Sequence, residues 1–467
     1  MKKKLLSILA LLCLTVTSAW AQEEKWSGGT YTATHNESTE IIVNVNEDAT
    51  LTINSGVTVT VNNGVVVGDG ATLTIEGEGK LIVNGRNFGA GRDGGAAFTG
   101  AVIVCGGTVV ATGGAGGKGR DGYKSSHPGA GGAGGAAFTG EVTVSGGTVV
   151  ATGGAGGAGG KDRSDSRAGG DGGAGGAAFA ATASLTFSGG TVTALGAAGG
   201  AGGVGRTDGQ AGADGKAFTN AVTFNSTTDY MMFGGDDANS VTQTDNSTNH
   251  RYVGIATPVS VTANWASGAY WSTFYSSAGN FQAPEGTQVF MVKLNSDDPP
   301  TLQITEVEDG IVKSGQGVVL RQTAASNDPA TTTLVMTPTA SEVTGDFAND
   351  NSLKGTMVPI TCSGENNYYV LNHTDDYGVG FYKLAEDGTG TIGANKAYLE
   401  YSASAGGEAR PFFGFDEEVT GISAAQQSTE ELDGGEWFDL QGRPVAHPTK
   451  GLYIVRQGKS RKVVVGN

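Results

Sequence analysis

Between residues 40 and 84, apolar side chains alternate with polar ones in short runs that return after 22 residues. The recurring pairs are Val43 with Val65, Val45 with Val67, Leu51 with Leu73, Ile53 with Ile75, Val59 with Leu81 and Val61 with Val83. Such alternation is typical of a β-strand with one face turned inward. Three such strands at one constant offset predict the coils of a parallel β-helix (β-solenoid), in which equivalent side chains stack about 4.8 Å apart.

A longer repeat follows, marked by a phenylalanine that returns at spacings of 40, 41 and 39 residues. Its four copies carry Phe98, Phe138, Phe179 and Phe218, each after an alanine. The first three copies then enter strand-like stretches, which predict further coils stacked on their neighbours. Glycine pairs such as Gly106-Gly107 would form the corners of these coils, or else two-residue hairpin turns. The parallel register nearby favours corners.

Glycine-rich insertions separate these stretches, and within them glycine recurs every third residue. The positions are 113, 116, 119 and 122; 153, 156 and 159; 169, 172 and 175; 196, 199, 202 and 205; and 209, 212 and 215. This period fits an extended helix with three residues per turn. Collagen is excluded, because the runs are interrupted and Pro128 is the only proline between residues 85 and 216. We expect arms that run out and back and bond to one another through their backbones; flexible loops are the alternative.

Charged residues gather where each arm should reverse. The candidate ligand-binding residues there are Arg120, Asp121, Tyr123, Lys124, Lys161, Asp162, Arg163, Asp165, Arg206 and Asp208. Variable loop ends on a rigid scaffold are a common place for recognition. The alternative is that these residues only keep the ends of the arms solvated.

After about residue 250, the glycine excess ends and short strand-like runs with many aromatic residues predict a β-sandwich. The aromatic residues would form its core, or alternatively a platform on which sugars stack. The stretches 271–275, 378–383 and 395–399 are similar to secreted proteins of the Bacteroidales.

The chain begins like a secretory signal peptide. Three lysines precede an apolar stretch, and Ala19-Trp20-Ala21 provides a cleavage site between Ala21 and Gln22. No later segment has 18 continuous apolar residues, so we expect no transmembrane helix in the mature chain. The protein should therefore be secreted or reach the outer cell surface.

The last segment has a strand, a Gly-Arg turn, a Gly-hydrophobic-Tyr strand and a basic final strand. The residues that carry this pattern are Gly442, Arg443, Gly451, Tyr453 and Lys462. It resembles the C-terminal sorting domain of the type IX secretion system. The resemblance implies that the segment engages the secretion machinery at the outer membrane and is then removed as the protein is attached to the surface.

These observations together predict an all-β chain of several parts. They are a signal peptide (1–21), a parallel β-helix with glycine-rich insertions (22–247), a β-sandwich-like domain (248–417), a linker (418–435) and a small C-terminal β domain of the sorting type (436–467).

The charge balance narrows the choice of partners. The chain has 29 basic and 46 acidic residues, and loss of the signal peptide changes the net charge from −17 to −20, since 29 − 3 − 46 = −20. Nucleic acid is therefore not expected as a partner. The mature cysteines, Cys105 and Cys362, are expected as separate buried thiols, with a disulfide as the alternative, and their spacing matches no zinc pattern.

No catalytic motif is found: the five histidines lie far apart, and no nucleophile elbow or phosphate loop is present. We therefore expect no catalytic residue, metal or cofactor. The function expected is a non-catalytic secreted or surface protein that presents a repeat surface for adhesion or carbohydrate binding. The alternatives are a β-helix polysaccharide lyase or glycoside hydrolase, and a structural spacer.

Overall fold

The computed structural model describes residues 26, 28–40, 42–164, 166–225, 229–295, 301–324, 328–362, 367–374, 377–384, 390–401 and 412–415, together with three C-terminal strands. The chain divides into two compact units, Met1–Asp416 and Glu417–Asn467. Over the described residues the only helix is the single turn α2 (Phe347–Asp350). The remaining elements are strands, and the first part of the chain contains parallel sheets. The expected all-β class is confirmed.

Three parallel sheets build the first part of the larger unit. The first consists of β1 (Gly29–Ala33), β4 (Ala49–Ile53), β7 (Thr72–Gly77), β10 (Ala101–Val104), β12 (Glu141–Val144), β14 (Ser184–Phe187) and β16 (Thr223–Phe224). The second contains β2 (Glu37–Thr39), β5 (Thr58–Asn62), β8 (Lys80–Asn84), β11 (Thr108–Thr112), β13 (Thr148–Thr152) and β15 (Thr191–Leu195). The third consists of β3 (Val43–Val45), β6 (Val65–Val67) and β9 (Phe98–Thr99). The chain visits these sheets in turn.

The pairing of the strands confirms the 22-residue offset in two of the sheets. Val43 lies opposite Val65 in the third sheet, and Val59 lies opposite Leu81 in the second. In the first sheet the expected pairing of Leu51 with Leu73 is wrong, because Leu51 lies opposite Ile75 and the offset there is 24.

The shift has a local cause. The connection that leads into β7 is two residues longer than the equivalent connection into β4, and the connection that leaves β7 is two residues shorter. A shift of two residues keeps every inward side chain on the inward face, so the core remains apolar. The short exit is possible because Gly77 adopts a φ of +95°.

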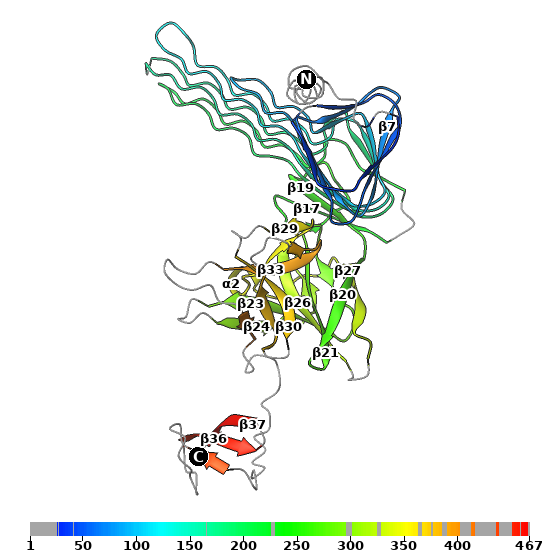
Figure 1. The fold of residues 1–467 in the computed structure, drawn as a ribbon. Coiled ribbons are helices and arrows are strands. Elements are labelled where there is room, and N and C mark those ends of the chain that lie inside the picture. The colour runs from blue at the N-terminus through cyan, green and yellow to red at the C-terminus, as the bar shows by residue number, and fades with distance from the viewer. Residues whose placement is uncertain are drawn as a thin grey trace, which may run out of the picture. The chain divides into compact units, whose positions relative to one another are not determined.

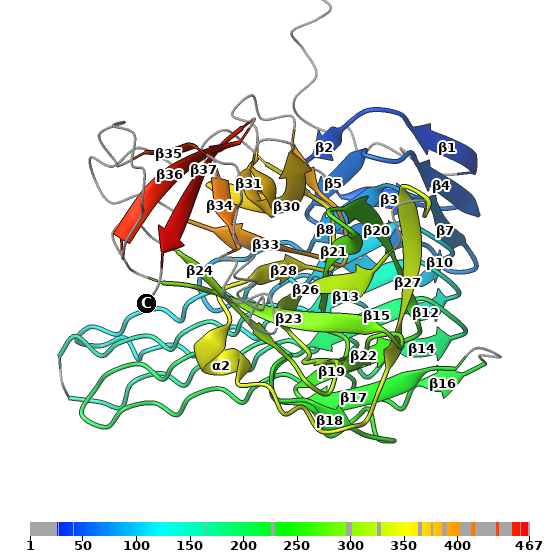
Figure 2. The same cartoon turned by 90° about the horizontal axis from the view of Figure 1, so that it is seen from below.

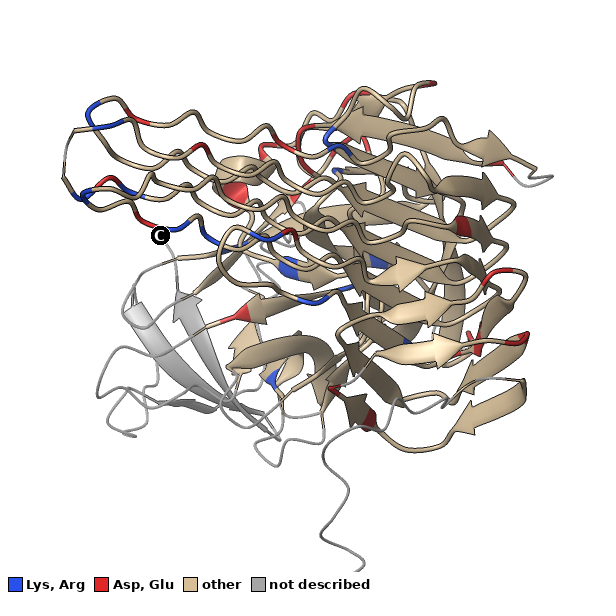
Figure 3. Ribbon diagram, turned by 90° about the horizontal axis from the view of Figure 1, so that it is seen from above, with Lys and Arg blue, Asp and Glu red and all other residues tan. Residues whose placement is uncertain are grey.

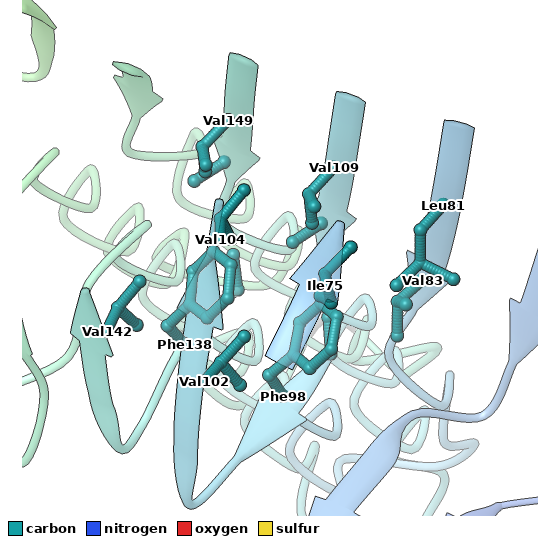
Figure 4. Packing of buried hydrophobic residues seen from close by; sticks show 14 of the residues in the cluster. Ile75, Leu81, Val83, Phe98, Val102, Val104, Val109, Phe138, Val142 and Val149 are labelled. Carbon is teal, nitrogen blue, oxygen red and sulfur yellow. The ribbon is translucent and has the colours of Figure 1, made fainter. Parts of the chain in front are cut away.

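Inside the sheets, the four repeat phenylalanines form a continuous ladder. Adjacent rings from Phe98 to Phe218 stack with centroids 5.0, 5.0 and 4.5 Å apart, and all four are buried. Figure 4 shows Phe98 and Phe138 lying beside the inward side chains of neighbouring strands, among them Val102 and Val104. Offset aromatic stacking adds to the hydrophobic burial of each ring.

Each glycine-rich insertion begins after a strand of the second sheet and ends at the next repeat phenylalanine. In Figures 1 and 2 they run out and back as extended chains, side by side. The amides of Gly113, Gly116 and Gly119 donate to carbonyls of the next outgoing arm at 2.8–2.9 Å. The next glycine in a triplet donates to a returning arm, as Gly114 does to Gly95 at 2.8 Å. The expected backbone-bonded arms are confirmed.

The closeness of the arms explains why glycine is required. A Cβ at Gly113 would lie less than 3.0 Å from the Gly135 carbonyl, and one at Gly134 would meet the Gly154 carbonyl in the same way. The third residue of a triplet points outward, as the exposed Ala155 and Lys161 do. Each arm is therefore closed to side chains inside and variable outside.

The second sheet continues beyond residue 247, where we expected the first region to end. Its last strands are β17 (Met231–Gly235), β18 (Thr242–Gln243) and β19 (Tyr252–Ala256), and β19 pairs antiparallel with β15. The expected boundary therefore falls inside one sheet.

The rest of the larger unit is antiparallel. An eight-stranded sheet has the order β24 (Leu302–Glu306), β23 (Thr287–Leu294), β26 (Gln316–Thr323), β21 (Ala269–Ser276), β20 (Val259–Ala266), β27 (Thr331–Pro338), β22 (Phe281–Gln282) and β25 (Ile311–Val312). A five-stranded sheet has the order β28 (Lys354–Thr356), β33 (Lys396–Glu400), β30 (Tyr368–Thr374), β31 (Gly378–Lys383) and β34 (Phe412–Gly414). The short strands β29 (Ile360–Thr361) and β32 (Thr391–Ile392) pair separately. Aromatic residues such as Phe274, Phe281 and Phe381 are buried here, as a core requires.

The smaller unit contains a three-stranded antiparallel sheet of β35 (Glu436–Phe438), β36 (Gly451–Gln457) and β37 (Lys459–Val465). Gly451 and Tyr453 lie in β36, and Lys462 of β37 is paired with Ile454. Gly442 and Arg443 lie outside the described residues, as do Ala21 and Gln22 at the expected cleavage site.

Candidate interaction site at the ends of the glycine arms

The outer ends of the second, third and fourth arms lie side by side. We call them the arm tips: residues 118–128, 161–167 without Asp165, and 204–208. The amide of Gly122 donates to the Lys161 carbonyl at 2.8 Å, and the amide of Asp162 donates to Val204 at 2.8 Å. Charged residues are visible at the far end of the arms in Figure 3. Stacking of the copies thus gathers residues that are about 40 positions apart in sequence.

Asp121 links two tips. Its carboxylate accepts hydrogen bonds from the Lys161 amide at 3.1 Å, from Lys118 Nζ at 2.9 Å and from Arg163 Nη2 at 2.9 Å. These three donors, the Lys161 amide first, hold the pKa of Asp121 well below its ordinary value. The carboxylate is therefore ionised and occupied by its own protein.

Asp162 closes the turn of the third tip. It is only 5% exposed, and it accepts bonds from Ser164 Oγ at 2.8 Å and from the amides of Ser166 and Arg167 at 2.8 and 2.7 Å. Burial acts to raise its pKa, but the hydrogen bonds outweigh burial and lower the pKa to about 2. An aspartate that bonds to the backbone just after it is a common turn former. Asp162 is consequently a structural residue and not an exposed ligand-binding group.

One tyrosine and four basic residues of the tips are exposed to solvent. Tyr123 is 55% exposed, and the ammonium of Lys124 lies 5.2 Å from the centre of its ring. Arg120, Lys161 and Arg206 are also exposed. Across the described residues, no carboxylate lies within 4.0 Å of the charged groups of Arg120, Lys124, Lys161 or Arg206. These cations are available to an external partner.

The other expected site residues have mixed outcomes. Arg163 is engaged with Asp121, and Asp208 accepts a hydrogen bond from the Gly205 amide at 3.3 Å. Asp165 lies outside the described residues. Every expected tip residue that the structure describes is brought to the same end of the arms.

Sequence reasoning missed a second structural use of polar side chains along the arms. Asn87 caps the Ala115 amide at 2.6 Å, Asp93 caps Ala133 at 2.8 Å, and Asp171 caps Gln210 at 2.8 Å. These amides point outward, away from the carbonyls to which the glycine amides of the arms donate. A side chain of the preceding copy accepts their hydrogen bonds instead. The available signal was an Asp or Asn at the third place of a triplet, 28 to 40 residues before the amide it caps.

The expectation of two buried thiols is half wrong. Cys362 is buried, and burial raises the pKa of its thiol, but Cys105 is exposed at the end of β10. Cys105 follows the inward Val104, so the alternation of the strand turns it outward. Both cysteines are free.

A cavity of about 270 Å³ lies among β20, β21, β30, β31 and β33 and is lined in part by Trp271, His373 and Lys396. The ring of Trp271 is already covered by Arg321, 5.5 Å from its centre, and by Phe415, stacked at 5.9 Å. The ring is therefore already engaged by its own protein, and the arm tips, where Tyr123 is 55% exposed, are the stronger candidate.

In the part of the chain that the structure describes, no group of three or more His, Cys, Asp or Glu side chains is placed to hold a metal ion. A search of the same residues finds no helix with the length and apolar character needed to cross a membrane. Comparison with protein-family models, with curated proteins and with solved structures gives no match to this chain.

Proposed function

We propose that this is a non-catalytic secreted or cell-surface protein that uses its arm tips for adhesion or carbohydrate binding. One observation carries the proposal: the exposed Arg120, Tyr123, Lys124, Lys161 and Arg206 gather at the far end of arms whose backbones are hydrogen-bonded along their length. Residues that serve solubility alone would not need so ordered a support.

The proposed scaffold is a parallel β-helix with glycine arms. Its support is the rotation of the chain through three parallel sheets and the phenylalanine ladder that continues from copy to copy. Glycine loses more conformational entropy on ordering than any other residue. Since that cost is met when the arms fold, little of it remains to be met when a ligand binds.

The hydrogen bonding of Asp121 and Asp162 suits these two carboxylates to structure and not to catalysis. A general acid or base works best with a pKa near the working pH. Asp121 and Asp162 both have a pKa far below that range, and their oxygens are held by protein donors. A polysaccharide lyase or hydrolase would need carboxylates that reach the substrate.

Export to the outer surface is part of the proposal. It is supported by the signal-like residues 1–21 and by the resemblance of residues 436–467 to a sorting domain. Protease treatment of intact cells tests it: digestion without lysis is expected, whereas full protection until lysis would contradict export.

Binding is tested on a glycan array with the wild-type protein and with Tyr123→Ala. Tyr377→Ala is a matched control, since Tyr377 is an exposed tyrosine (66%) remote in sequence from the arms. We expect binding that is weakened by Tyr123→Ala and unchanged by Tyr377→Ala, with no release of reducing or unsaturated sugar ends. Sugar-end release by the wild-type protein would favour the enzyme alternative, and an absence of all binding would favour the spacer.

A further inference from the structure

The arm tips carry the opposite charge balance to the chain as a whole. The basic residues among positions 118–128, 161–167 and 204–208 are Lys118, Arg120, Lys124, Lys161, Arg163, Arg167 and Arg206, and the acidic ones are Asp121, Asp162, Asp165 and Asp208. Seven minus four gives +3 at the tips, in a chain of net charge −17.

Two of the four acidic residues at the tips are held by hydrogen bonds within the protein. Asp121 is held by Lys118, Arg163 and the Lys161 amide, and Asp162 is buried under the amides of its own turn. Hydrogen bonds thus turn these two carboxylates toward the protein, while the cations of Arg120, Lys124 and Arg206 face solvent.

The three tips form one continuous edge and not three separate loops. Gly122 is bonded to Lys161, Arg206 is bonded to Arg167 through the backbone at 2.8 Å, and the guanidinium of Arg167 donates to the Ser126 carbonyl at 3.0 Å. An extended ligand could therefore contact residues of all three arms at once.

We propose that this edge binds an anionic polysaccharide, with sulfate or carboxylate groups on a sugar chain; this inference rests on the proposed function. Guanidinium and ammonium groups make charge-assisted hydrogen bonds to such anions. The exposed ring of Tyr123 supplies an apolar face for a sugar. The acidic remainder of the protein repels polyanions, which confines binding to the tips and disfavours a long nucleic acid.

The test compares dextran sulfate and polygalacturonate with neutral dextran, using the purified full chain in a binding assay at several salt concentrations. The tip variant is Arg120→Gln/Lys124→Gln/Lys161→Gln. The control variant is Lys293→Gln/Lys313→Gln/Lys354→Gln, which removes the same charge from the antiparallel region. Circular dichroism and thermal unfolding establish that both variants are folded; if the tip triple variant is not folded, the three single variants replace it.

We expect the tip variant to bind the charged glycans at least roughly tenfold more weakly, the control to bind as wild type, and added salt to weaken wild-type binding. Equal binding to neutral dextran, or equal loss in the control, would overturn the anionic ligand while leaving the proposed function intact. Tip-dependent binding to single-stranded DNA that exceeds binding to either charged glycan would also overturn it. Failure to bind any sugar on the array would contradict the proposed function itself.

Discussion

Single atoms decide how the arms pack. Where two arms approach, the hydrogen of a glycine is the largest substituent that the neighbouring carbonyl leaves room for. The surrounding backbone cannot yield easily, because its own amides and carbonyls are engaged in the network. Positions that look alike in sequence can therefore respond very differently to one added methyl group.

Gly134→Ala should destabilise the arms by about 3 kcal/mol, because its methyl group would overlap the Gly154 carbonyl. Gly89→Ala is the control, since no atom lies within 4 Å of a Cβ at that position. It should be neutral or stabilising by up to about 1 kcal/mol. Urea unfolding and hydrogen exchange of the arm amides would measure both effects; equal stability of the two variants would contradict the packing argument.

Phe138→Ala should cost about 3–5 kcal/mol in the free energy of unfolding, because it removes a fully buried ring stacked between two others. Phe138→Leu keeps much of the volume and should cost less. Thermal and urea unfolding of both variants would test the ladder, and a loss below about 1 kcal/mol for Phe138→Ala would show that the ring is not well packed.

Asp162 should make stability depend on acid pH. Its folded-state pKa of about 2 lies below the ordinary value of 3.8, so its ionised form stabilises the folded state above about pH 4. This stabilisation is lost as the pH falls toward 2. Asp162→Asn should flatten that dependence, whereas Asp208→Asn, at an exposed side chain with one amide bond, should not. Unfolding midpoints measured from pH 2 to 6 would test this. The prediction is wrong if the midpoint of Asp162→Asn depends on pH as strongly as that of the wild-type protein.

The unit of about 40 residues is the structural element that recurs from copy to copy. Each of the four copies contributes one phenylalanine to the ladder and one arm, and each of the first three also contributes one strand to each of two parallel sheets. In such arrays stability comes from each unit and its nearest interfaces.

Deletion of residues 139–179 should leave a folded protein with one arm fewer, because β10 would then meet β14 and β11 would meet β15. Deletion of 139–158 should not, because it removes β12, β13 and the outgoing residues Gly154 and Gly157, to which the returning Gly176 and Gly173 donate. Circular dichroism and thermal unfolding would compare the two proteins. Equal loss of structure in both would contradict the equivalence of the copies.

At the scale of the whole molecule, the residues that hold the fold together are distinct from the exposed charged residues. The inward positions of the first part are apolar and the arm interiors are glycine, while the exposed cations Arg120, Lys124, Lys161 and Arg206 lie at the outer ends of the arms. The smaller unit, Glu417–Asn467, has its own three-stranded sheet.

Because the two units are compact by themselves, a chain that ends at Asp416 should keep the unfolding temperature of the larger unit within about 2 °C. Calorimetry of the truncated and full chains would measure this. A large fall in the unfolding temperature of the truncated protein would show that the smaller unit stabilises the larger one.

The alternation of side chains, its constant offset of 22 residues and the threefold glycine period were enough to predict parallel strands, the pairing of Val43 with Val65 and the arms, because periods of two and three residues follow directly from backbone geometry. The pairing of Leu51 with Ile75 could not be read in this way, because a slip of two residues leaves the alternation unchanged. The roles of Asp121 and Asp162 could not be predicted from the sequence either, because their hydrogen-bond donors come from another copy or from the folded turn. Local periodicity is a property of neighbouring residues and can be read from the sequence. Strand register and hydrogen-bond partners depend instead on which residues, distant in sequence, come within about 3 Å of one another on folding.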